Sequence, residues 1–213
     1  MKIKEMLKLG GILAVFAAAA CVMLAFVYTG TQKIIAERKE SDKLQALEDI
    51  FPDADDYEEI SISEVIPGIT IDAAYKAVKD GETSGLIIAL NRNGYSGPIK
   101  LMTGVTVDGI ITGVKILEQT ETPGLGSNAA SGAYYVNRDK KITFYGQFTG
   151  KSAEDRFEVN NDVQGITAST ITSRAVSSAV KAACIAAVSW MSGGPLSEED
   201  IDSVSGASIG GSE

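Results

Sequence analysis

The residues of this chain best suited to chemistry form a hydroxyl-rich run at 167–173, Thr-Ala-Ser-Thr-Ile-Thr-Ser. The run lies where a predicted strand gives way to a long helix. The first turn of a helix presents unpaired N–H groups and the positive end of the helix dipole, and nearby hydroxyls add further donors. The run therefore predicts an anion site suited to a phosphate. The alternative is that Thr167, Ser169 or Thr170 only caps the helix, as Ser and Thr often do.

A second candidate is the segment 121–126, Glu-Thr-Pro-Gly-Leu-Gly. Pro123 keeps Thr122 extended, because a residue before proline avoids the helical region. Gly124 and Gly126 permit a tight turn with exposed amides and leave space for a flat ligand. The alternative is an ordinary Pro-Gly turn. Neither segment identifies a function by itself.

Composition narrows the possible chemistry. The 213 residues include 19 basic and 28 acidic side chains, and the net charge of −9 disfavours nucleic acid as a partner. Histidine is absent, and Cys21 and Cys184 are the only cysteines, so the chain cannot assemble a typical zinc site or a cysteine-ligated iron–sulfur cluster. We expect no metal site and no disulfide. Redox chemistry in this chain would need an organic cofactor.

The elements that position these segments begin with a predicted transmembrane helix at 9–32, which contains no charged residue. A cleaved signal peptide is the alternative, since Ala17 to Cys21 resembles a lipobox, but the apolar run continues past it. Lys2, Lys4 and Lys8 in the segment 1–8 favour a cytoplasmic N-terminus and a main domain outside the cytoplasm.

The rest of the chain is expected to contain one domain with appendages. Residues 33–60 are predicted to form a stalk helix, stopped by Pro52, and an acidic linker over 53–59. The domain itself is expected at 61–192. The Ser-, Gly- and acid-rich segment 193–213 has little apolar content, which predicts a flexible tail.

Within the domain, alternating and β-branched runs predict an antiparallel sheet with strands at 73–78, 86–90, 99–107 and 110–117. Asp108-Gly109 predicts a type I′ hairpin turn. Phe144, Phe148 and Phe157 are expected core residues. A long helix is predicted to begin near Ile171, with Arg174, Ser177, Ser178 and Lys181 on its polar face. The predicted fold class is α+β, with helices packed on an antiparallel sheet.

Taken together, these segments resemble a known family: the FMN-binding G-type subunit of the Rnf electron-transport complex, which is related to the C-type subunit of the sodium-translocating NADH:quinone reductase. The resemblance rests on the N-terminal anchor, on 94–99 (GYSGPI), on the hairpin at Asp108-Gly109, on 121–126 (ETPGLG), on 144–151 (FYGQFTGK) and on 167–176 (TASTITSRAV). The most specific of these is ETPGLG.

The resemblance implies that FMN is attached through its phosphate to a threonine hydroxyl, here Thr170. Thr167, Ala168, Ser169 and Thr172 are then expected around the phosphate. Glu121, Thr122, Gly124, Leu125, Gly126 and Tyr95 are expected around the isoalloxazine ring. A rival acceptor is Ser208, in the segment 202–208, which fits the literal attachment pattern but is not followed by a predicted helix.

The function that the resemblance implies is electron relay within an ion-translocating ferredoxin:NAD⁺ oxidoreductase complex. The expected partners are the other membrane subunits, a flavin-transferring enzyme and membrane lipid, with no independent catalysis by this chain. Two alternatives stay open: a stand-alone extracytoplasmic FMN carrier or quinone-reductase subunit, and a membrane-anchored assembly module without redox activity.

Overall fold

The computed structural model describes residues 3–62, 66–194, 201 and 204, and it divides the chain into two compact units, 1–44 and 45–213. Helix α1 (Ile3–Ile50) makes up the described part of the first unit and enters the second. Its stretch Gly10–Ile50 includes a window with a mean hydropathy of 2.5, none of which is buried. The helix is therefore long and apolar enough to cross a bilayer, a property that it shares with signal sequences. It ends at Ile50, two residues before Pro52.

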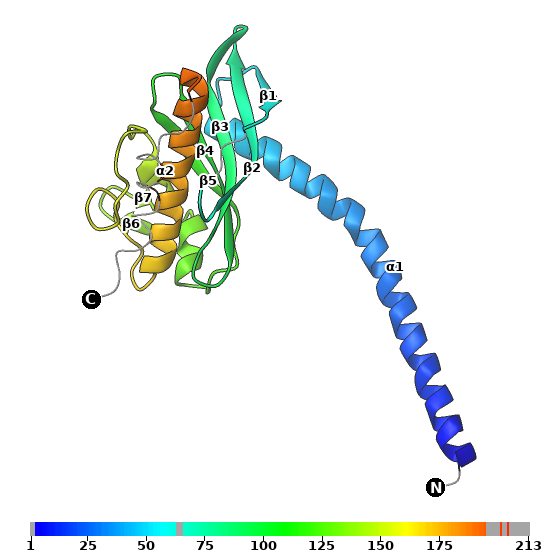
Figure 1. Ribbon diagram of the computed structural model, residues 1–213. Coiled ribbons are helices and arrows are strands. Elements are labelled where there is room, and N and C mark those ends of the chain that lie inside the picture. Colours follow the sequence, from blue (N-terminus) through cyan, green and yellow to red (C-terminus); the bar gives the residue numbers. More distant parts are fainter. Residues whose placement is uncertain (1–2, 63–65, 195–200, 202–203, 205–213) are drawn as a thin grey trace. The chain divides into compact units, whose positions relative to one another are not determined.

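The second unit contains a five-stranded antiparallel sheet whose strands follow chain order (Figure 1). The strands are β1 (Asp56–Ile60), β2 (Ile69–Lys79), β3 (Glu82–Asn93), β4 (Pro98–Thr106) and β5 (Ile111–Glu118). The predicted α+β class and antiparallel sheet are confirmed. The prediction of an acidic linker over 53–59 is partly wrong, because residues 56–60 form strand β1 and pair with β2. Side chains at alternate positions of a strand point to opposite faces, so an edge strand can carry several acids toward solvent.

Both faces of the sheet are covered. Leu86, Ile88 and Leu90 of β3 belong to the larger core cluster, which includes helix α2 (Thr170–Ser192) along one face (Figure 1). Ile87 and Ala89 alternate with them and belong to a smaller cluster. In that cluster they pack with the last turn of α1 and with the residue that follows it, which supply Ala46, Leu47, Ile50 and Phe51. The compact unit therefore begins before residue 61, at the end of the predicted stalk.

The hairpin turns differ from the prediction. The Asp108-Gly109 hairpin exists, but only Gly109 has a positive φ (+74°), and its N–H donates to Thr106 O, so the connection is a three-residue loop. The turn with two positive φ angles lies instead between β2 and β3, where Asp80 (+52°) and Gly81 (+80°) form a two-residue connection. An Asp-Gly pair can occupy a two-residue or a three-residue hairpin loop, and the register of the two paired strands determines which loop forms.

Short elements separate the sheet from α2: the 3₁₀ turns η1 (Gly126–Ala130) and η2 (Tyr145–Phe148), and the strands β6 (Tyr135–Asn137) and β7 (Ile142–Thr143). Phe144, Phe148 and Phe157 are buried, as predicted. The ring centroid of Phe148 lies 5.8 Å from that of Phe144 and 5.9 Å from that of Phe157. These aromatic contacts hold the irregular segment against the sheet.

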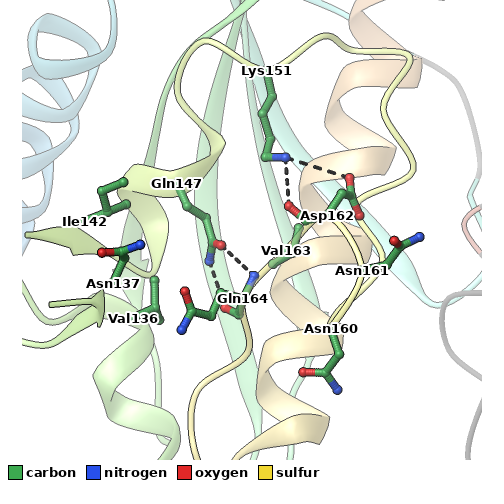
Figure 2. Close-up of a pocket in the computed structure, with 10 residues that line it drawn as sticks. All are labelled: Val136, Asn137, Ile142, Gln147, Lys151, Asn160, Asn161, Asp162, Val163 and Gln164. Atoms are coloured by element: carbon green, nitrogen blue, oxygen red, sulfur yellow. Dashed lines mark hydrogen bonds and ion pairs between the residues drawn. The ribbon is translucent and has the colours of Figure 1, made fainter. Parts of the chain in front are cut away.

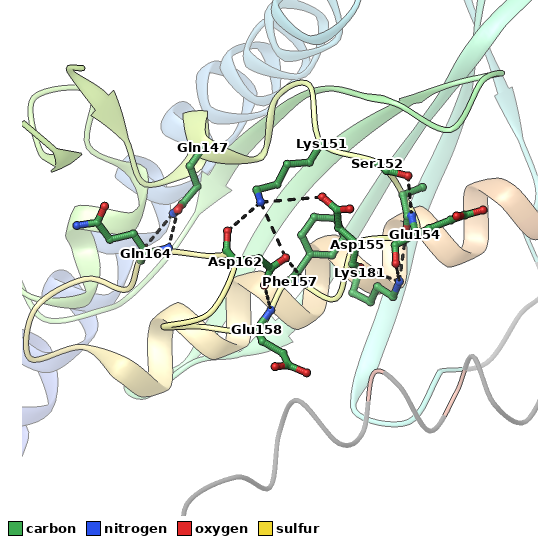
Figure 3. Close-up of polar contacts among 11 residues, drawn as sticks. Gln147, Lys151, Ser152, Glu154, Asp155, Phe157, Glu158, Asp162, Gln164 and Lys181 are labelled. Atoms are coloured by element: carbon green, nitrogen blue, oxygen red, sulfur yellow. Dashed lines mark hydrogen bonds and ion pairs between the residues drawn. The ribbon is translucent and has the colours of Figure 1, made fainter. Parts of the chain in front are cut away.

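Helix α2 is buried on more sides than its sequence pattern predicts. Ser177 and Ser178, expected on the polar face, are each 1% exposed. The segment 153–155 is joined to α2 at Lys181, whose Nζ donates to three successive backbone carbonyls at 2.9–3.3 Å (Figure 3). The predicted tail lies mostly outside the described residues. Its residue Val204 is 1% exposed and belongs to the core, against the expectation that the tail does not pack.

Candidate functional site

A cavity of about 460 Å³ opens at the start of α2, between three segments that are distant in sequence. One wall comes from 168–172, another from the loop before η1, and Tyr95 closes a third side. The lining residues are Tyr95, Glu121, Thr122, Leu125, Gly126, Ala168, Ser169, Thr170, Ile171 and Thr172. The two segments that the sequence singled out therefore meet at one site.

The start of α2 offers several unused hydrogen-bond donors. Ser169 is the N-cap residue, yet its side chain makes no capping hydrogen bond, so the capping alternative does not account for this hydroxyl. Within the described residues, the N–H groups of Thr170, Ile171 and Thr172 have no hydrogen-bond acceptor, as expected in a first helical turn. Ala168 precedes them in the left-handed region, at φ +58°. Such a terminus binds anions.

Glu121 ties the walls of the cavity together. Its side chain is buried, at 6% exposure, and both carboxylate oxygens have donors. Oε1 accepts the N–H of Ser96 at 2.9 Å, and Oε2 accepts the Thr172 hydroxyl at 2.6 Å. A buried carboxylate with two donors is a strong link, because hydrogen bonds to charged groups are the stronger class. Glu121 therefore joins β3–β4, the 121–126 segment and α2.

Two glycines make this close approach possible. A Cβ on Gly126 would lie 2.6 Å from Thr172 Oγ1 and 2.9 Å from Glu121 Cβ. A Cβ on Gly94 would lie 2.7 Å from Ile99 Cδ1 and would also meet the Glu121 carboxylate. Neither position can hold a larger residue without a shift of its neighbours.

Of the residues predicted for the site, only Gly124 and Thr167 do not line the cavity. Gly124 shapes the turn instead: its φ is +78°, its N–H donates to Ser127 Oγ at 3.0 Å, and its carbonyl accepts Asn128 Nδ2 at 2.9 Å. Ile171 lines the cavity at 54% exposure and was not predicted there. The sequence signal that could have identified Ile171 as a lining residue is its position within the hydroxyl-rich run 167–173. Ser208 lies outside the described residues.

A second cavity, of about 480 Å³, is lined mainly by amide side chains and by Lys151 (Figure 2). Most of its polar side chains have hydrogen-bond partners in the protein. Gln147 exchanges hydrogen bonds with the backbone of Gln164 at 2.8 and 3.1 Å, and Lys151 Nζ donates to Asp162 O at 2.8 Å. The Asp162 carboxylate accepts backbone N–H groups of residues 157 and 158. Most polar side chains of this cavity are therefore used to hold the loop together.

Comparison with known proteins decides the family. The FMN-binding domain model matches residues 94–184, and the RnfG N-terminal region model matches residues 1–50. The G-type subunit of the Na⁺-translocating ferredoxin:NAD⁺ oxidoreductase complex of Acetobacterium woodii is 32% identical over 195 residues, covering 83% of this chain and 89% of that protein. The chain belongs to the RnfG family of ion-translocating oxidoreductase complexes.

Other known proteins are also similar to this chain. The G-type subunit of the ion-translocating oxidoreductase complex from Methanosarcina acetivorans is 31% identical over 84% of this chain and 93% of that protein. The C-type subunit of the Na⁺-translocating NADH-quinone reductase from Parabacteroides distasonis aligns in structure with a TM-score of 0.42 at 19% identity, over 73% of this chain and 94% of that one. NqrC of Shewanella oneidensis gives 0.41 at 19% identity, over 74% of each chain. Both segments of the cavity lie inside the FMN-binding match.

The cavity residues of this RnfG-family chain fit an FMN group. The unpaired amides and hydroxyls at the start of α2 suit its phosphate. Tyr95, Leu125 and Ile171, which are 71%, 42% and 54% exposed, give the rim an apolar character suited to a flat ring system. No group of three or more acidic or cysteine side chains that could hold a metal ion occurs in the described part of the chain.

Proposed function

We propose that this chain is the FMN-carrying electron-transfer subunit of an Rnf-type complex, and that FMN is attached through its phosphate to Thr170 Oγ1. One observation carries the proposal. Thr170 is an exposed residue at the first position of α2, on the lip of the cavity, and its hydroxyl has no hydrogen-bond partner among the described residues. A hydroxyl in this position is accessible to a flavin-transferring enzyme.

The neighbouring hydroxyls are less suitable as acceptors. The Thr172 hydroxyl is 2.6 Å from Glu121 Oε2, and Ser173 Oγ donates to Ser169 O while it accepts the N–H of Ile166. Ser169 is 8% exposed. These residues therefore support the wall of the site, and Thr167 lies outside the lining. We select Thr170 because its hydroxyl has no partner among the described residues, whereas the hydroxyls of Thr172 and Ser173 each have one.

The phosphate would be held by the free amides of the first helical turn, with Ser169 and Thr170 contributing at the N-cap and first positions. Tyr95, Thr122 and Leu125 would line the ring. Glu121 was expected to contact the ring, but both of its carboxylate oxygens already have protein donors. Its proposed role is to hold the two sides of the cavity at a fixed separation.

When bound, FMN supplies reversible one- or two-electron chemistry, and the chain supplies position and electrostatic environment. By analogy with the A. woodii protein, whose complex is a ferredoxin:NAD⁺ oxidoreductase, the partners are the other membrane subunits. We propose that α1 is a single membrane span with the lysine-rich N-terminus in the cytoplasm, which places the FMN-carrying domain outside. Protease added to intact spheroplasts then removes the domain, whereas protection of the domain contradicts this orientation.

The attachment is tested on the full chain purified from its own host and run on a denaturing gel. Flavin fluorescence in the band supports a covalent link, and a dark band from native membranes contradicts it. Thr170→Val should abolish the fluorescence, whereas Thr170→Ser keeps a hydroxyl and should retain it. Ser208→Ala is the control for the rival acceptor. Fluorescence that survives Thr170→Val and disappears in Ser208→Ala moves the attachment to the C-terminal segment.

A further inference from the structure

A smaller cavity of about 280 Å³ adjoins the candidate flavin site and shares Ile171 with it. Its lining is Gly68, Arg92, Asn93, Ile171, Arg174 and Ala175. The chain is acidic, with only five arginines, and two of them meet in this cavity without an acidic side chain in the lining. Such a concentration of positive charge in a protein of net charge −9 favours an anionic ligand.

Arg92 is the more constrained of the two arginines. Its Nη1 atom is buried and has no hydrogen-bond partner among the described residues. Burial also lowers the pKa of its guanidinium from the ordinary value. Buried donors are almost always paired, and Nη1 is covered by protein in this conformation, so the Arg92 guanidinium would have to turn toward the cavity that it lines to pair this donor with a bound anion. Carboxylate and phosphate oxygens match the donor geometry of a guanidinium group.

Arg174 relates this cavity to the attachment position. It follows Thr170 by four residues in α2, and residues four apart lie on the same side of a helix. A long, flexible arginine side chain one turn along can therefore reach a group carried on residue 170. Asn93, at the end of β3, adds an amide donor to the same lining.

We propose that Arg92, Asn93 and Arg174 form the phosphate subsite for the flavin nucleotide, next to the amides at the start of α2. This inference rests on the proposed function, because it assigns the anion to the nucleotide on Thr170. Arg92 and Arg174 would neutralise the negative charge of the phosphodiester, and the amides at the start of α2 would donate hydrogen bonds to it. The subsite also discriminates FMN from riboflavin, which lacks the phosphate.

The subsite is tested with the full-length Thr170→Val chain, which cannot carry a phosphothreonine link, by titration calorimetry with FMN, riboflavin and inorganic phosphate. FMN should bind at least tenfold more tightly than riboflavin. Arg174→Gln should weaken FMN binding by about tenfold to hundredfold, the range that one charge-assisted hydrogen bond supplies, and should leave riboflavin unchanged. Arg156→Gln is the matched control, because the Arg156 side chain is 79% exposed and lies outside the cavity.

The half-buried Arg92 is tested second, as Arg92→Gln, with thermal unfolding to verify the fold. Equal affinities for FMN and riboflavin overturn the subsite, as does an FMN affinity that survives both substitutions. Binding of inorganic phosphate that depends on Arg174 but does not compete with FMN also overturns it, because the anion is then not the nucleotide. These failures are distinct from that of the proposed function, which fails if the native Thr170 chain carries no covalent flavin.

Discussion

Replacement of Thr172 by valine should show whether the Glu121–Thr172 hydrogen bond stabilises the domain, while the proposed attachment hydroxyl of Thr170 stays in place. Valine has nearly the shape of threonine, so Thr172→Val removes the 2.6 Å hydrogen bond to Glu121 Oε2 without opening a cavity. Both residues are buried, at 1% and 6% exposure. A hydrogen bond to a charged group contributes about 1.5–3 kcal/mol, and the carboxylate oxygen left without a donor adds to the loss. We expect the free energy of unfolding to fall by about 2–3 kcal/mol.

The assay is thermal unfolding of the full chain in detergent, followed by circular dichroism. For a domain of this size the loss corresponds to a Tm lower by about 4–12 °C. Thr170→Val is the matched control, with every variant produced in a host without the flavin-transferring enzyme so that none carries FMN: it removes an exposed hydroxyl without a protein partner among the described residues and should change stability by less than about 0.5 kcal/mol. In a double-mutant cycle with Glu121→Gln, the two losses should not add. An unchanged Tm for Thr172→Val, or an equal loss for Thr170→Val, refutes the role given to Glu121.

Three further predictions concern the scaffold. Gly85→Ala should cost about 1–3 kcal/mol in unfolding experiments, because its Cβ would lie 2.6 Å from Phe51 Cζ, whereas Gly113→Ala, with no neighbour nearer than 3.7 Å, should be mild. Lys181→Met should cost about 2 kcal/mol and speed amide exchange at 153–157, because three carbonyls lose their donor. Burial raises the pKa of Cys184 to about 12 from an ordinary value of 9.0, so stability should decline as pH rises from about 9 to about 12. Cys184→Ala should flatten that alkaline decline in pH-dependent unfolding, and a parallel decline in both proteins contradicts the assignment.

Local patterns in the sequence predicted the elements that depend on periodicity. The antiparallel strands and the helix beginning at the hydroxyl-rich run follow from alternation and from a 3.6-residue repeat. The three buried phenylalanines follow from their size and their apolar character. Burial of Ser177 and Ser178 could not be predicted, because it depends on how α2 packs in the folded domain and not on the spacing of residues along the helix.

In the candidate site, too, local features were predicted and contacts between distant residues were not. The sequence identified both walls of the cavity, since each contains residue types with local signatures for a turn or a helix start. The Glu121–Thr172 hydrogen bond joins residues 51 positions apart, and no spacing rule predicts such a pair. That Arg92 and Arg174 line the same cavity was not predicted either. The two residues are distant in sequence, and β3 and α2 meet only in the folded domain.

The position of strand β1 constrains how electron transfer in this domain could involve motion. A flexible linker at 53–59 would let the domain swing on its anchor, but within 45–60 the chain is fixed at both ends. Leu47, Ile50 and Phe51 are buried against one face of the sheet, and residues 56–60 pair with β2. Since α2 packs on the other face, strand β3 connects the start of the domain rigidly to the candidate site. If the domain is anchored as proposed, displacement of that site relative to the membrane would arise before residue 45 or as motion of the whole protein, and substitution of the exposed Asp53 or Glu59 should leave electron transfer unchanged.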